Sequence, residues 1–140
     1  MDNIFTSIWE NNPGIFLVAL FLGLVAVVAN WRLFVKCGQS GLAAFIPIYN
    51  IVVALRIVGR PDSHIFFFLI PIYGQLIFPF IVTIDLLKSF GKYHWVDYIL
   101  ALVFNIFYIL NLGLAYNEDY YGPAYGMSID ELKQRKPVLA

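Results

Sequence analysis

The sequence predicts an all-α, polytopic transmembrane protein with three spans and one broken helix that lies at the membrane interface or re-enters it. Three apolar stretches, residues 15–35, 65–84 and 95–115, each have the length of about 20 residues that a helix needs to cross a bilayer. Of the 140 residues, 61% are hydrophobic and 13% are charged, and the mean hydropathy is +0.77. Such a chain has too little polar surface to cover a soluble globule.

The first span has a recognisable start and an orientation. Asn12 is a suitable N-cap and Pro13 suits the first helical turn. The flank at residues 1–14 contains no Lys or Arg, whereas Arg32 and Lys36 follow the span. Because basic residues are retained in the cytoplasm, we expect the N-terminus outside and the first span to be a permanent anchor of the inner membrane.

The second apolar segment, residues 42–55, is interrupted by Pro47, Tyr49 and Asn50. Proline disfavours a helical conformation in its predecessor, so Ile46 and Pro47 should separate a short helix from a second one capped by Asn50. A broken helix in lipid leaves backbone groups that only protein or water can satisfy. The segment therefore lies in the interface, re-enters as two half-helices, or spans beside helices that cover the break.

The basic residues favour three spans over the alternative of four. If the second segment does not cross, seven of the nine basic residues lie inside and Lys88 and Lys92 lie outside. With four spans only four lie inside. The positive-inside rule thus places the C-terminus in the cytoplasm.

The stretch at residues 65–84 contains Pro71, Gly74 and Pro79, which predict a kinked or split helix. Asp85 and Lys88 follow it, and their spacing of three places them on one helical face, where they can pair. Asp85 is of interest because carboxylates near membrane depth can mark ion paths.

The last span and the tail complete the organisation. Asn105 and Asn111 within residues 95–115 are expected to bond neighbouring helices. Ser128 and Glu131 have the spacing of a capping box, which predicts a short surface helix in the tail. We divide the chain into one transmembrane domain, residues 1–126, and a polar C-terminal tail, residues 127–140.

No catalytic or metal-binding pattern stands out. Ser89 and Lys88 are adjacent, so on a helix they point about 100° apart and do not form a Ser/Lys dyad. His64 and His94 flank apolar segments and belong to no ligand cluster. We expect neither an enzyme nor a metal site, and no cofactor is predicted.

A family resemblance rests on four stretches: LFVKCGQSGLAAFIPIYN at residues 33–50, RIVGRP at 56–61, IDLLKSFGK at 84–92 and NLGLAYNEDYYGPA at 111–124. In these the chain resembles a bacterial family of small membrane proteins of unknown function. It is also similar to the membrane module that precedes the catalytic part of some signal peptidase I chains. The resemblance implies a membrane domain without an assigned role and a module that ends inside the cell.

We predict a non-enzymatic membrane protein that is a scaffold or accessory subunit of a larger assembly. The alternative is a small homo-oligomeric transporter or channel around the broken segment. The expected partners are the lipid bilayer and membrane proteins or further copies of the chain, whereas the zero net charge disfavours nucleic acid. The candidate structural or functional polar positions are Pro47, Tyr49, Asn50, Asp85 and Lys88.

Overall fold

The structure, a computed structural model, describes residues 2–138, and these are helical with no β-strand among them. The α-helices are α1 (Asp2–Asn11), α2 (Pro13–Lys36), α3 (Pro47–Val58), α4 (Phe78–Ser89), α5 (Trp95–Val103), α6 (Asn105–Leu114) and α7 (Ile129–Lys133). The 3-10 or π-type helices are η1 (Gly41–Phe45), η2 (Asp62–Leu69) and η3 (Tyr73–Ile77). The all-α prediction is confirmed.

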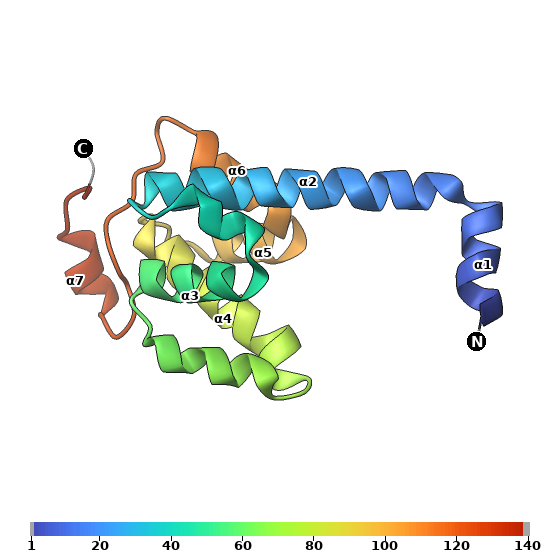
Figure 1. The fold of residues 1–140 in the computed structure, drawn as a ribbon. Helices are drawn as coiled ribbons and strands as arrows, with labels where there is room; N and C mark the ends of the chain where they lie inside the picture. Colours follow the sequence, from blue (N-terminus) through green and yellow to red (C-terminus); the bar gives the residue numbers. More distant parts are fainter. Residues whose placement is uncertain (1, 139–140) are drawn as a thin grey trace.

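Helix α2 is the longest element, and the chain that follows it packs against its C-terminal half (Figure 1). The N-terminal end of α2 contacts α1, where the centres of the Trp9 and Phe16 rings are 4.4 Å apart. Its fully buried residues are Ala29, Leu33 and Phe34, all in that half. A helix of 24 residues is about 36 Å long and exceeds the roughly 30 Å of a hydrocarbon core. By length and composition α2 can cross a membrane.

Helix α2 begins at Pro13 with Asn12 at the N-cap position, as predicted, although the Asn12 side chain makes no capping bond. Helix α1 was not predicted from the sequence, and it lies across the N-terminal end of α2 (Figure 1). Apolar side chains such as Ile4, Phe5 and Trp9 are exposed on it.

The chain after α2 forms three successive helical hairpins, each of which leaves and returns to the end of the bundle where α2 stops (Figure 1). Hairpin 1 is η1 with α3, hairpin 2 is η2 and η3 with α4, and hairpin 3 is α5 with α6. We call the shared end the polar end. It contains the C-terminal residues of α2, α3, α4 and α6, namely Lys36, Val58, Ser89 and Leu114.

Hairpin 1 turns at the predicted proline. Ile46 is extended, with φ −107° and ψ 106°, and α3 begins at Pro47, as expected where proline excludes its predecessor from the helix. The break is therefore confirmed. The predicted Asn50 cap is wrong, because the N-cap position belongs to Ile46 and Asn50 lies within the first turn of α3.

Hairpin 2 replaces the span expected over residues 65–84. The chain reverses at residues 70–72, and Ile72 has a positive φ of 66°, which is unusual for a β-branched residue. Gly74 then passes against the preceding arm, where a Cβ atom would lie 1.9 Å from the Phe67 carbonyl oxygen. Only glycine allows the two arms to approach this closely.

Residues 95–115, which were expected to form one span, form hairpin 3. Helices α5 and α6 are bent by 114° with respect to each other, and Phe104 between them has φ −114° and ψ 40°. No proline or glycine marks this turn, so sequence reasoning had no local signal for it. Within the described residues α2 alone is long enough to span, or α2 and the bent pair if that pair is counted as one span.

The core lies between the C-terminal half of α2 and the hairpins. Helix α6 packs tightly on α2, because a Cβ atom at Gly113 would lie 2.9 Å from the Leu33 amide nitrogen. Buried side chains from α2 and from every hairpin form this core, among them Leu33, Phe34, Ala44, Val53, Ile57, Leu86, Leu87, Ala101 and Leu112. The hairpins are thereby fixed around one half of α2.

Candidate functional site

The polar end gathers the C-terminal carbonyl groups of four helices, and a segment of the chain closes over them. We call residues 115–127 the strap. Its Tyr121 amide donates to the Ser89 carbonyl of α4 at 2.8 Å, and its Ala124 and Tyr125 amides donate to the Val58 carbonyl of α3 at 3.1 and 2.9 Å. The strap thus satisfies acceptors that a helix end leaves without a partner.

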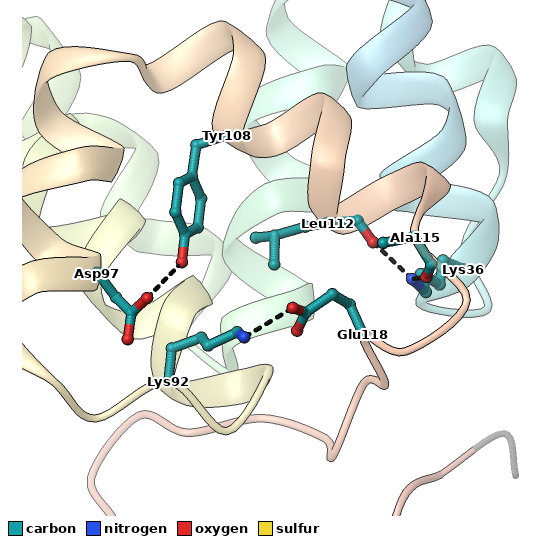
Figure 2. A network of polar contacts seen from close by, with 7 residues as sticks. All are labelled: Lys36, Lys92, Asp97, Tyr108, Leu112, Ala115 and Glu118. Carbon is teal, nitrogen blue, oxygen red and sulfur yellow. Dashed lines mark hydrogen bonds and ion pairs between the residues drawn. The ribbon is translucent and has the colours of Figure 1, made fainter.

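Lys36 caps the C-terminus of α6 from the neighbouring helix α2. Its Nζ atom donates to the carbonyl oxygens of Leu112 and Ala115, each at 2.6 Å (Figure 2). The Nζ atom also lies 5.9 Å from the centre of the Phe90 ring. A cation in this position offsets the partial negative charge at the end of α6.

Two further polar pairs extend this network. Lys92 donates to Glu118 of the strap at 2.7 Å, and the Tyr108 hydroxyl donates to Asp97 at 3.0 Å (Figure 2). The first pair holds the strap to the loop after α4, and the second joins α6 to α5. Both therefore connect elements that meet at the polar end.

Asp85 forms an ion pair that the sequence analysis did not find. Its carboxylate accepts from Nε of Arg60 at 2.7 Å and lies 2.6 Å from Nη2. Both side chains are only 11% exposed, and the guanidinium lies 4.4 Å from the centre of the Tyr125 ring. The predicted pairing of Asp85 with Lys88 is wrong.

The pairing error has a physical reason. Asp85 points into the bundle, where Arg60 arrives from the turn after α3, while Lys88 is half-buried and has no hydrogen bond or ion pair with the described residues. The spacing of residues along α4 indicates only which side chains lie near Asp85 on the same helix, and Lys88 is one of them. The true partner, 25 residues away, depended on hairpin 2 folding back.

The three predicted positions of the broken segment do not converge on a binding site. Pro47 begins α3. The side-chain amide of Asn50 donates to the Ala44 carbonyl oxygen at 3.5 Å, across the break. Tyr49 is exposed. Asn50 therefore serves to close hairpin 1, and Asp85 and Lys88 lie at the other end of the bundle.

Reactive side chains at the polar end are buried. Burial raises the pKa of the Cys37 thiol to about 12, which keeps it protonated and a poor nucleophile. The Ser89 hydroxyl donates to the Asp85 carbonyl at 3.0 Å. Within residues 2–138 no three side chains of His, Cys, Asp or Glu are placed to hold a metal ion.

Residues 2–138 thus form an all-helical structure with one helix long enough to cross a membrane and three hairpins joined at the polar end. The chain belongs to a family of unknown function, DUF5684, which matches residues 42–123. The matched range contains all three hairpins except Gly41 and most of the strap, whereas α1, α2 and α7 lie wholly outside it. Neither a curated protein nor a solved structure matches the chain.

Proposed function

We propose that the chain is an inner-membrane protein whose only crossing is α2 and whose three hairpins enter one leaflet and return. The α-helices of the hairpins have 9 to 12 residues and are about 14–18 Å long, roughly half of the hydrocarbon core. Helix α1, with its exposed apolar side chains, would lie in the opposite interface.

The distribution of charge supports this placement. All nine basic residues fall at or after Arg32, in the last two turns of helices at the polar end, the loops between hairpins or the tail: Arg32, Lys36, Arg56, Arg60, Lys88, Lys92, Lys133, Arg135 and Lys136. A single crossing puts all nine on one side, against seven for three spans. By the positive-inside rule the polar end is cytoplasmic and the N-terminus is outside.

Impermeant maleimide labelling tests the topology. In a Cys37→Ala background, single cysteines replace Ser7, Ser63, His94 and Met127, which are all exposed. We expect labelling of the Ser7→Cys variant on intact cells, and labelling of the other three only after permeabilisation. His94 is decisive, because three spans place the loop at residues 90–94 outside; labelling there on intact cells would contradict the hairpins.

Within this placement we propose that the protein is a non-enzymatic scaffold or accessory subunit that docks a transmembrane helix of a partner protein. The supporting observation is the N-terminal half of α2, which the hairpins leave uncovered (Figure 1). Ala19 and Gly23 are exposed there, four residues apart on one face. Small residues with this spacing let two helices approach closely in lipid.

A substitution of Gly23 tests the docking surface. No atom of residues 2–138 lies within 4 Å of a Cβ at Gly23, so Gly23→Leu leaves the fold intact but blocks close approach of another helix. We expect partner recovery, measured by native mass spectrometry after mild extraction, to fall by about tenfold, a loss of roughly 1.4 kcal/mol.

Val18→Leu is the matched control, since Val18 is exposed on a different face of α2. It should retain the partner. A wild-type protein recovered only as a monomer would refute the accessory role, and recovery only with a second copy of itself would favour the homo-oligomeric alternative.

A further inference from the structure

Arg32 lines an open pocket, and its charged group has no partner among the described side chains. Its guanidinium makes no hydrogen bond or ion pair with the described residues. The pocket has a volume of about 270 Å³ and is lined by Arg32, Lys36 and residues 113–116, which are the end of α6 and the start of the strap. Among the described residues no acidic side chain lines it. Lys36 is attracted by Glu118 and Asp119 outside the pocket, so Arg32 is the cation in the pocket that no carboxylate offsets.

The walls of this pocket are held in place by contacts already described. Lys36 uses two of its three N–H groups on the Leu112 and Ala115 carbonyls, which leaves one donor. Gly113 packs against the backbone of α2, because a Cβ atom there would lie 3.2 Å from the Arg32 carbonyl carbon. The two cations are therefore presented by a rigid corner between α2 and α6.

A second, mostly apolar hollow adjoins the first. It also has a volume of about 270 Å³ and is lined by Val28, Trp31 and Arg32. Val28 is one helical turn from Arg32 toward the N-terminus, deeper in the proposed membrane. Arg32 thus lies between a cationic pocket at the interface and an apolar surface that leads into the hydrocarbon.

We propose that Arg32 and Lys36 bind the phosphate of an anionic phospholipid, with its glycerol and upper acyl chain against Val28 and Trp31. The two cations supply the donors for phosphate oxygens, and Arg32 can bind two of them at once. The apolar hollow favours a lipid over free phosphate. The inference rests on the proposed membrane placement of α2, but it requires no protein partner.

Lipid titration of the purified full-length chain, followed by native mass spectrometry, tests the site. We expect phosphatidylglycerol to bind more tightly than phosphatidylcholine, and Arg32→Gln to weaken phosphatidylglycerol binding by about tenfold, as for the loss of one charged hydrogen-bonding group. Arg32→Lys should retain part of the affinity. Lys88→Gln is the control, because it removes the same charge from another unpaired cation at the polar end.

Several outcomes would overturn the site. Equal loss of affinity in Lys88→Gln would show attraction by overall charge, and equal binding of phosphatidylcholine would refute recognition of an anionic lipid. Displacement by millimolar inorganic phosphate would refute the lipid as the source of the phosphate. Because these measurements use the purified chain in detergent, without a membrane or a partner protein, their failure is distinct from a failure of the labelling or partner experiments.

Discussion

Replacing Gly74 with alanine is expected to destabilise the protein by about 3 kcal/mol, the upper range for a residue forced into a packed site. The added Cβ atom would lie 1.9 Å from the Phe67 carbonyl oxygen and 2.7 Å from the Phe68 Cα atom. Both are backbone atoms of the opposite arm of hairpin 2, so the arms must separate. Unfolding in a mixed-micelle denaturant titration measures the loss.

The matched control is Gly23→Ala, since a Cβ atom at Gly23 meets nothing within 4 Å. It should be neutral or slightly stabilising. The comparison also tests the fold, because Phe67 and Gly74 are seven residues apart and their backbones would not touch in a continuous helix. Wild-type stability of Gly74→Ala would therefore speak for a straight span over residues 65–84.

Replacing Asp85 with asparagine is expected to cost about 3 kcal/mol, because one partner of a buried ion pair is removed and the other charge is left behind. Arg60 would remain beside the rings of Tyr125 and Phe78, which cannot replace a carboxylate. The same titration measures the loss. The strap should loosen as well, since Tyr125 belongs to it and donates its amide to Val58.

Two further variants distinguish the loss of the buried Arg60–Asp85 pair from a general effect of removing a charge. Asp62→Asn removes a carboxylate from the exposed pair with Arg56, and exposed pairs contribute little, so its effect should be small. The double variant Arg60→Met with Asp85→Leu should be more stable than Asp85→Asn, because no charge is left unpaired. Equal losses in Asp62→Asn and Asp85→Asn would contradict the importance of the buried pair.

Local signals predicted the features that depend on a few neighbouring residues. The extended Ile46 before Pro47 follows from the steric demand of proline. The capping box at Ser128 and Glu131 is confirmed, because each side chain bonds the other residue's backbone amide. The start of α2 at Pro13 is likewise confirmed.

The hairpins could not be predicted from the sequence. The length and hydropathy of an apolar stretch do not show whether the chain runs straight through it or turns back within it. Residues 95–115 have the composition of one span, and the reversal at Phe104 occurs without Gly or Pro. Pro71 and Gly74 indicated a break in the preceding stretch, yet not that the chain turns back. The Lys36 cap and the Arg60 pair followed from these reversals, so they could not be found either.

Because the hairpins surround only one half of α2, the protein has unequal cross-sections at its two ends (Figure 1). In the proposed orientation it displaces much more lipid area from the cytoplasmic leaflet than from the outer one. In a membrane containing many copies, the larger area of the cytoplasmic leaflet would curve the bilayer so that its cytoplasmic surface becomes convex. The shape of the molecule would then couple its local density to membrane curvature, and would favour its accumulation where the cytoplasmic surface is convex.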